Sequence, residues 1–294
     1  MRDLALYLAN HDNNIYRRRL YMPKMKDQLP SDWEVLSSKA HTVSIHTGAM
    51  KDTDWPQMEF PKVKALVLYF IASEYCIPTF LHTMKNLKVL IIHNADGAKR
   101  SKLSGVAGFQ ELSQLKTLHL ERLIVPEEWK GLGRDKTFNF PGLLEFNVSY
   151  CIDLEELPAG LCSSNSLKKL SVTHCHRLAK LPDEMDKLLS LKKITLFESP
   201  GLTALPSSIC HLKKLKFLDI SSCICLKVNK WRRCELKDTL QRVAKMSSLK
   251  RVICDKKNEQ LFKSTSRTDL KVHTVVEQEG NLDWLYLKTL NGRN

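Results

Sequence analysis

Two clusters of histidine and cysteine in this 294-residue chain have the side chains and the close spacing of metal ligands. The first is His174-Cys175-His176 and the second is Cys223-x-Cys225. Imidazole nitrogens and thiolates are ligands that zinc prefers, but a structural zinc site needs four that converge. Neither cluster supplies four, and Cys175 and Cys223 also occupy a repeat position that points into the core. We therefore predict no metal site.

The sequence lacks the local motifs that mark catalytic and nucleotide-binding sites. It contains no Gly-x-Ser-x-Gly nucleophile elbow, no His-Glu-x-x-His zinc motif and no glycine-rich phosphate loop ending in Gly-Lys-Ser/Thr. We therefore predict that the chain is not an enzyme and carries no cofactor. Its functional residues are expected to bind a partner, and repeated elements of the chain position them.

The dominant pattern is an apolar triplet, Leu-x-x-Leu-x-Leu or a close variant. Its most regular copies begin at Leu167, Leu191 and Leu215, so the period is 24 residues. A fixed period of this size indicates a solenoid, in which each unit buries its apolar face against its neighbours. About eight to nine repeats are predicted, because further copies begin at Ala40, Val63, Leu87, Leu115, Leu143 and Leu249.

Each unit contains a strand and a return crossing. Apolar and outward residues alternate, as in Leu170-Ser171-Val172, which predicts a β-strand. A Leu-Pro pair such as Leu181-Pro182 follows and favours an extended crossing, because proline fixes φ. The predicted fold class is therefore α/β, a leucine-rich-repeat solenoid with a curved parallel sheet inside and short helical or extended crossings outside.

A small polar or thiol side chain stands three residues after the last apolar strand position in the regular repeats. In leucine-rich repeats this position, called the slot here, holds a side chain that bonds backbone groups where the chain leaves the sheet. We predict a buried structural role for the slot residues Cys151, Cys175, Ser199 and Cys223.

The outward strand positions form the predicted partner-binding surface. Phe197 and Phe217 lie in adjacent repeats beside lysines, and aromatic side chains are frequent binding hot spots. The longer crossings Asn94–Gly108 and Val125–Asn139 are expected to form loops that add specificity. The predicted partner-binding residues are Lys169, Ser171, Thr173, Lys193, Thr195, Phe197, Phe217, Asp219 and Ser221.

Bulk composition limits the kind of partner and the compartment. The net charge of +14 implies an acidic protein surface, nucleic acid or an anionic membrane, although lysine can also serve solubility alone. The longest apolar run, Ala65–Ala72, is too short to span a bilayer. Nine cysteines is an odd number, and no paired-cysteine caps flank the repeats. A reduced, intracellular compartment is therefore expected.

One step between repeats is irregular. Leu215 and Leu249 are 34 residues apart, too long for one regular unit and too short for two. Trp231 and Cys234 imitate the last apolar strand position and the slot. We therefore predict a damaged repeat between them, with its crossing partly missing.

The repeat Leu-x-x-Leu-x-Leu-x-x-Cys-x-x-Leu-x-x-Leu-Pro resembles that of plant intracellular nucleotide-binding leucine-rich-repeat immune receptors. The resemblance covers nearly the whole chain. It is strongest with helper receptors whose N-terminal domain is of the powdery-mildew-resistance type, and among them with the activated-disease-resistance clade. The matching segments are residues 1–10 (M-R-D-L-A-L-Y-L-A-N), Arg17–Pro23, Leu29–Trp33, Val43–Trp55, Arg251–Asp255 and Asn281–Leu285.

This resemblance implies a division of the chain into three parts. Residues 1–35 would be a short helical remnant of a winged-helix domain, 36–255 the solenoid, and 256–294 a cap and tail. The family's coiled-coil-like domain, phosphate loop and His-Asp sensor, with which full-length relatives bind ADP or ATP, are not in this sequence. We therefore expect a C-terminal fragment, a truncated product or a start assigned too late.

The resemblance also implies a function. The chain would be a non-enzymatic recognition or regulatory module in plant innate immunity. Its partner would be its own nucleotide-binding module or a lipase-like heterodimer of the enhanced-disease-susceptibility type, and full-length relatives oligomerise. A cytoplasmic location is expected, with the plasma membrane and the nucleus as further places of action. An alternative is a substrate adaptor of a ubiquitin ligase, because Leu29–Trp33 is similar to the start of an F-box.

Overall fold

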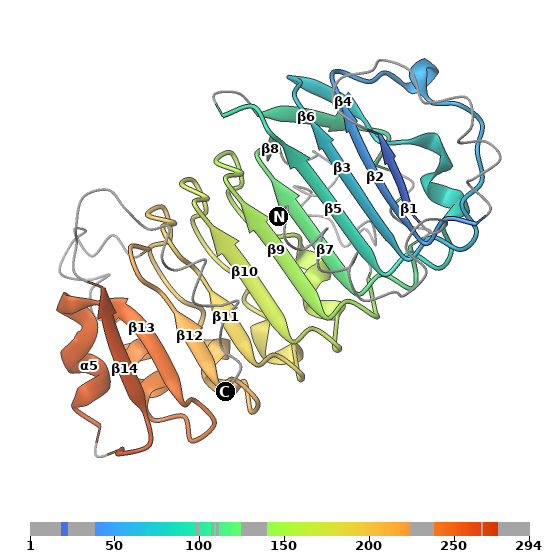
Figure 1. Cartoon of the computed structure of the whole chain (residues 1–294). Helices are drawn as coiled ribbons and strands as arrows, with labels where there is room; N and C mark the ends of the chain where they lie inside the picture. Colours follow the sequence, from blue (N-terminus) through green and yellow to red (C-terminus); the bar gives the residue numbers. More distant parts are fainter. Residues whose placement is uncertain are drawn as a thin grey trace.

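The computed structural model describes residues 19–22, 39–97, 100–106, 109, 112–124, 140–223, 238–265 and 267–275. Eleven strands form one parallel sheet that runs along the molecule (Figure 1). In sheet order they are β1 (Arg19–Met22), β2 (Thr42–Thr47), β3 (Ala65–Phe70), β5 (Val89–Asn94), β7 (Thr117–Glu121), β9 (Glu145–Ser149), β10 (Lys169–Thr173), β11 (Lys193–Thr195), β12 (Phe217–Asp219), β13 (Arg251–Asp255) and β14 (Lys271–Val275).

The sheet register joins equivalent positions of successive repeats. Leu170 pairs with Ile194, and Ile194 pairs with Leu218. All three side chains are fully buried, and they belong to one apolar core that continues from repeat to repeat. The predicted leucine-rich-repeat solenoid is therefore confirmed, because the 24-residue period brings the same apolar position into line in each unit.

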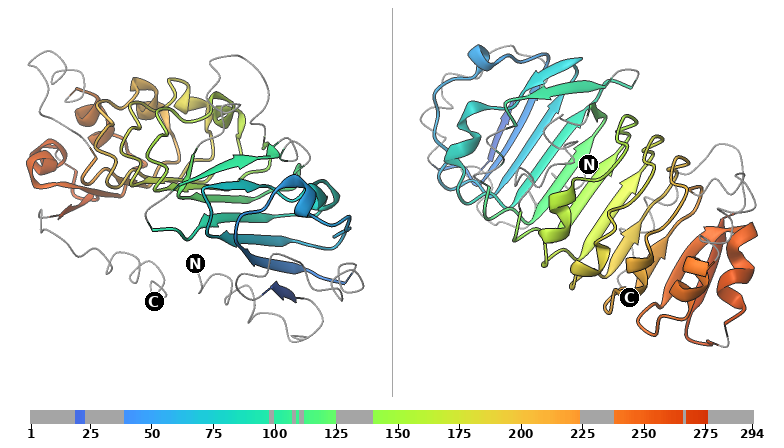
Figure 2. Two further views of the ribbon diagram at one scale, coloured as in Figure 1. Left: turned by 90° about the horizontal axis from the view of Figure 1, so that it is seen from above. Right: turned by 180° about the vertical axis from the view of Figure 1, so that it is seen from behind.

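The crossings form a second layer behind the sheet (Figure 2). Three of their short helices follow a proline, and Pro158 with φ of −54° is one example. Proline therefore ends the extended part of the crossing and fixes where the helix begins. The 3-10 helices within the described residues are η1 (Asp52–Asp54), η2 (Thr79–Thr83), η4 (Ala159–Ser163), η5 (Met185–Lys187), η6 (Ser207–His211) and η7 (Lys256–Asn258), and η7 leads into the α-helix α5 (Glu259–Lys263).

A second, smaller parallel sheet lies beyond the ends of β3, β5 and β7 (Figure 1). Its strands are β4 (Glu74–Cys76), β6 (Ser101–Ser104) and β8 (Leu123–Ile124). The segment Asn94–Gly108 was expected to be a loop, but β6 occupies part of it, with Leu103 buried. Gly105 ends this strand at φ of +72°, where an added Cβ would lie 3.2 Å from the carbonyl oxygen of Ile77.

The large sheet continues past both limits predicted for the solenoid. Arg19–Met22 forms β1, which pairs with β2, although a helical segment was expected there. Lys271–Val275 forms β14, which pairs with β13. The remainder of residues 1–35, and the tail from 276 onward, lie outside the described residues.

The 34-residue step is one long repeat, so the prediction of a damaged repeat is wrong. β12 pairs directly with β13, which leaves no place in the sheet for an intervening strand. The crossing includes a helix at residues 238–244, which buries Leu240, Val243 and Ala244 at helical spacing. Trp231 and Cys234 lie outside the described residues.

Within the part of the chain that the structure describes, no helix has the length and apolar character needed to cross a membrane.

Candidate functional site

Outward residues on the concave face of the large sheet, the face turned away from the crossings, line up in three rows across the strands. The register of β9 to β13 defines them. The first row is Glu145, Lys169, Lys193, Phe217 and Arg251. The second row is Asn147, Ser171, Thr195, Asp219 and Ile253. The third row, two residues further along each strand direction, is Ser149, Thr173, Phe197, Ser221 and Asp255.

Five of the nine predicted partner-binding residues reach the surface of these rows. Lys169 is exposed and its Nζ lies 2.6 Å from Glu145 Oε1. Lys193 Nζ lies 4.7 Å from the ring centre of Phe217, a cation–π contact. Burial, and secondarily the charge of Lys169, lowers the pKa of Lys193. The half-buried hydroxyls of Ser171 and Thr195 lie between these charges and the third row.

The other four predicted residues, Thr173, Phe197, Asp219 and Ser221, are buried. The side chain of Phe197 is only 7% exposed, so the prediction of an exposed aromatic pair is wrong for Phe197. Its ring lies edge-on to His174, with 5.3 Å between ring centres. All five third-row side chains are buried, and they stand at or next to the turn that ends each strand.

Asp219 shapes the turn after β12. Its Oδ1 accepts hydrogen bonds from the backbone N–H of Ser221 at 3.1 Å and from the Ser221 hydroxyl at 2.6 Å. Burial raises the pKa of Asp219, although the bonds from Ser221 oppose that shift. The N–H of the next residue, Ser222, donates to Asp255 Oδ1 at 2.8 Å. These carboxylates thus hold the chain as it leaves the sheet.

The four slot residues all lie buried at the point where the chain turns away from the sheet. Each donates to the carbonyl oxygen two residues earlier, for example Cys175 Sγ to Thr173 at 3.4 Å. Ser199 Oγ also accepts from the Cys175 N–H at 3.4 Å. Burial raises the pKa of Cys175 to about 12. The equivalent bonds join Cys151 to Ser149, Ser199 to Phe197 and Cys223 to Ser221.

A row of non-glycine residues with left-handed backbone lies next to the slot and was missed at the sequence level. Their φ values lie between 51° and 56°. Four of them donate their N–H to a third-row carbonyl of the next repeat, as Tyr150 does to Thr173 at 3.0 Å. This conformation is costly for non-glycine residues, so the bond between repeats must hold it. The row is Arg122, Tyr150, His174, Glu198 and Ser222.

The side chains of this row also contact one another. The guanidinium of Arg122 lies 4.6 Å from the ring centre of Tyr150. The rings of Tyr150 and His174 stack with centres 4.2 Å apart, and His174 Nε2 lies 2.8 Å from Glu198 Oε2. Burial lowers the pKa of His174, although Glu198 opposes that shift.

Toward the N-terminal repeats, aromatic and charged side chains in register with the third row also contact one another, and Glu121 links them to Arg122 of the left-handed row at 3.2 Å. Tyr69 stacks on both His46 and His93, with ring centres 4.9 Å apart in each pair. His93 Nδ1 lies 2.8 Å from Glu121 Oε2, and His119 Nε2 lies 3.6 Å from the same oxygen. Because these groups already contact each other, we infer that they mainly stabilise the stacking of repeats and are less available to bind a partner. Their shared register was the only sequence signal.

The His174-Cys175-His176 cluster does not converge on a metal position. Cys175 points into the core, while His174 contacts Glu198 beside it. No three His, Cys, Asp or Glu side chains are grouped for a metal ion among the described residues. Cys225 lies outside them, as do Val125–Asn139 and Leu29–Trp33.

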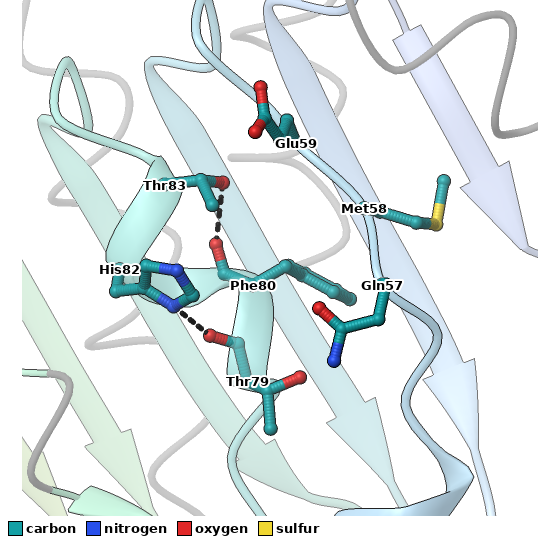
Figure 3. Close-up of a pocket in the computed structure, with 7 residues that line it drawn as sticks. All are labelled: Gln57, Met58, Glu59, Thr79, Phe80, His82 and Thr83. Carbon is teal, nitrogen blue, oxygen red and sulfur yellow. Dashed lines mark hydrogen bonds between the residues drawn. The ribbon is translucent and has the colours of Figure 1, made fainter.

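A hollow of about 360 Å³ lies on the crossing side of the first repeats (Figure 3). Segment 57–59 forms one wall and η2 the other. The polar groups of η2 mostly satisfy one another, since Thr83 Oγ1 donates to the Phe80 carbonyl at 2.7 Å and His82 Nδ1 bonds the Thr79 carbonyl. The polar groups of η2 are therefore largely engaged within that helix, while Gln57 and Glu59 line the opposite wall.

These features define the molecule as a leucine-rich-repeat protein whose concave face presents rows of polar and charged side chains. Over 196 residues it is 36% identical to probable disease resistance protein At4g33300 of Arabidopsis thaliana, which covers 58% of this chain and 24% of that protein. It is 34% identical to disease resistance protein ADR1 of the same plant, over 57% of this chain and 25% of that protein. The chain thus spans about a quarter of the length of these relatives.

Solved structures include the leucine-rich repeat domain of the type III effector XCV3220 (XopL), at a TM-score of 0.47 and 20% identity. That likeness covers 71% of this chain and 76% of the effector domain. No protein-family model matches the chain.

Proposed function

We propose that this chain is a non-catalytic recognition module of a plant disease-resistance protein, and that it binds a protein partner through its concave face. The observation that carries this proposal is the alignment of accessible side chains from successive repeats on β10 to β12, namely Lys169, Ser171, Lys193, Thr195 and Phe217. The similarity to plant disease-resistance proteins over more than half of the chain supports the defence context.

The accessible residues of β10 to β12 have the chemistry needed to bind the surface of a folded protein. Ser171 and Thr195 are neighbours in the second row and supply hydroxyl donors and acceptors. Phe217 adds an apolar ring next to the charge of Lys193. Rigid aromatic groups beside satisfied polar groups are the usual composition of a binding hot spot. This combination favours a partner with an acidic, partly apolar surface.

A lipase-like heterodimer of the enhanced-disease-susceptibility type is the first partner in this proposal, and the nucleotide-binding module of a full-length relative is the second. Binding to either would make the chain a regulator of immune activation. The proposed place of action is the cytoplasm, including the plasma-membrane surface and the nucleus. The similarity to disease-resistance proteins supports these assignments, while the concave face supports only the mode of contact.

The test is direct binding of the purified chain to the purified heterodimer by surface plasmon resonance. Ser171→Arg with Thr195→Arg should obstruct the face and weaken binding about tenfold or more, or about 1.4 kcal/mol. Ser163→Arg with Ser207→Arg is the matched control, because both serines are exposed in crossing helices and the charge change is the same. Equal loss in the two variants, or no binding by the unmodified chain to either partner, would refute the proposal.

A further inference from the structure

Seven lysines form a single file along the edge at which the strands of the large sheet begin. Each stands directly before a strand, and the residue in each repeat donates its N–H to the carbonyl of its counterpart in the preceding repeat, at 2.8 to 2.9 Å. Leu144 occupies the one apolar position within the file. The lysine column, as it is called below, is Lys64, Lys88, Lys116, Lys168, Lys192, Lys216 and Lys250.

The backbone ladder fixes the spacing of these charges. Neighbouring strands of a sheet lie about 4.8 Å apart, so successive column residues leave the backbone at that interval. All are exposed except Lys116, which is half-buried. The column lies along the edge opposite the small β4–β6–β8 sheet (Figure 1). It therefore borders the first row of the concave face.

Few carboxylates offset this charge. Within the described residues, Lys250 is the one column lysine that forms an ion pair, with Asp269 at 2.7 Å. The first row adds Lys193 and Arg251 next to the column, while Lys169 of the same row is paired with Glu145. Two ammonium groups held at this backbone interval of about 5 Å would repel by about 0.8 kcal/mol in water, and flexible side chains that spread apart would lessen it. A partner that brings negative charge to this edge would relieve that repulsion.

We propose that the lysine column binds an acidic segment of a protein partner that also occupies the concave face; this inference rests on the proposed function. The column is continuous with the first row, so one partner surface can contact both. Complementary charge along an edge would orient that partner and speed its association.

The composition of the column favours an acidic protein over nucleic acid. It contains no arginine, the residue whose planar fork binds phosphates and base edges in pairs of hydrogen bonds. It also contains no aromatic side chain on which bases could stack. Ser171 and Thr195 on the adjoining face offer hydroxyls to a folded surface. A bilayer would engage the column but would leave those hydroxyls unused.

The experiment compares two double charge reversals that change the net charge equally. Lys192→Glu with Lys216→Glu alters the middle of the column. Lys102→Glu with Lys257→Glu is the control, because both lysines are exposed and lie away from the column, Lys102 in β6 of the small sheet and Lys257 in η7 after β13. Fluorescein-labelled poly-glutamate of about 20 residues is the probe, measured by anisotropy at about 50 mM salt, where the Debye length exceeds the spacing of the charges.

We expect the column variant to bind poly-glutamate about tenfold more weakly, and the control to change less than about twofold. Thermal melts monitored by circular dichroism check that both variants fold. If the reversed column variant does not fold, Lys192→Gln with Lys216→Gln takes its place and should still weaken binding by about threefold. Equal losses in column and control would overturn the proposal, because they would reflect net charge alone.

Two further measurements complete the test. The first compares poly-glutamate with other polyanions, and the second distinguishes failure of the column inference from failure of the proposed function. Tighter binding of the unmodified chain to a DNA duplex or to phosphatidylserine vesicles than to poly-glutamate, lost in the column variant, would overturn the choice of an acidic protein. Capture of the lipase-like heterodimer tests the rest. If the column variant captures it at full affinity while Ser171→Arg with Thr195→Arg does not, the column inference fails and the proposed function stands.

Discussion

At the scale of the residue, Glu121 joins two histidines across neighbouring strands, and its titration should be measurable in the stability of the fold. Burial favours the neutral carboxyl, but hydrogen bonds from His119 and His93 outweigh it and hold the pKa of Glu121 well below its usual range. Because the folded pKa lies below the unfolded one, Glu121 stabilises the protein above about pH 4.5, and this contribution is lost as the pH falls through the folded value.

We therefore expect Glu121→Gln to be less stable than the unmodified chain at about pH 6, with the difference shrinking toward about pH 3. Urea unfolding at a series of pH values measures this. Asp219→Asn is an informative control, because burial raises the pKa of Asp219 and its ionisation therefore costs stability. Asp219→Asn should therefore lose less stability than the unmodified chain as the pH rises through the raised pKa of Asp219. A Glu121→Gln difference that is the same at every pH would contradict the assignment.

Alanine substitutions of Phe197 and Phe217 should have different effects, one on folding and the other on partner binding. Phe217 is accessible beside Lys193, so Phe217→Ala should raise the dissociation rate of a bound partner with little effect on folding. Phe197 is buried, so Phe197→Ala should cost about 3 kcal/mol of stability. Kinetics by surface plasmon resonance and urea unfolding distinguish the two. Similar effects of both changes on dissociation alone would contradict this arrangement.

Lys169 offers a contrasting test on the same face. Charge reversal there should slow association and alter its salt dependence, because exposed charges act mainly on encounter. Its Nζ is paired with Glu145, but this ion pair is exposed to solvent, so the change should affect folding by less than about 0.5 kcal/mol. An effect confined to dissociation would show that Lys169 is desolvated in the complex instead.

The sequence correctly predicted the burial of those residues whose position follows from alternation alone. It placed Leu170 and Ile194 in the core and Cys175 in the buried slot, because a strict period assigns each residue to one face. It could not foresee that Phe197 is enclosed, since alternation gives the direction of a side chain and not what packs over it. The left-handed row was equally hidden, because its members, such as Tyr150 and Glu198, share no residue type.

At the scale of the element, Arg267 holds the last crossing to the sheet. Its guanidinium donates to the carbonyls of Leu249 at 2.8 Å and of Met246, and it pairs with Asp269 at 2.8 Å. We expect Arg267→Ala to destabilise the chain by about 2 kcal/mol, because partly buried carbonyls lose a charged donor. Arg267→Lys should rescue little, since an ammonium cannot form the same fork.

Thermal and urea unfolding of these variants provide the measurement. The control is Arg177→Ala, whose partner Glu155 is also exposed, so that ion pair should contribute close to nothing. If Arg267→Ala and Arg177→Ala cost the same, Arg267 does not have the structural role assigned to it.

The elements that sequence reasoning missed are those without the repeated leucine pattern. β6 was missed because its alternation covers only Ser101–Ser104, too short to distinguish from a loop. β14 was missed because Val272 and Thr274 stand at its inward positions, which breaks the leucine pattern of the other strands. The 34-residue step was read as a damaged repeat because a helix in the crossing adds length without adding a strand.

At the scale of the whole molecule, the stacking of repeats has two consequences. Surface charge is organised in rows, and the stability of each repeat depends on its neighbours. The lysine column exists because one strand-start position recurs along the sheet, so a preference for lysine at that position becomes a line of charge. The side-chain contacts from His46 to Glu198 arise in the same way from two recurring positions, the third row and the left-handed row, near the other edge. A partner approaching the concave face therefore meets a cationic edge and an edge of paired aromatic, histidine and carboxylate groups.

The same stacking predicts how core substitutions combine. Leu90 and Leu218 are fully buried strand anchors in repeats that do not touch, so Leu90→Ala and Leu218→Ala should each cost about 2–5 kcal/mol. Because each repeat contacts only its neighbours, their double variant should show the sum to within about 0.5 kcal/mol where unfolding stays cooperative. Leu170→Ala with Ile194→Ala should depart from additivity, because these side chains occupy paired positions on adjacent strands. Urea unfolding of the singles and doubles measures both couplings, and a strong coupling between Leu90 and Leu218 would mean that strain is transmitted along the solenoid beyond nearest neighbours.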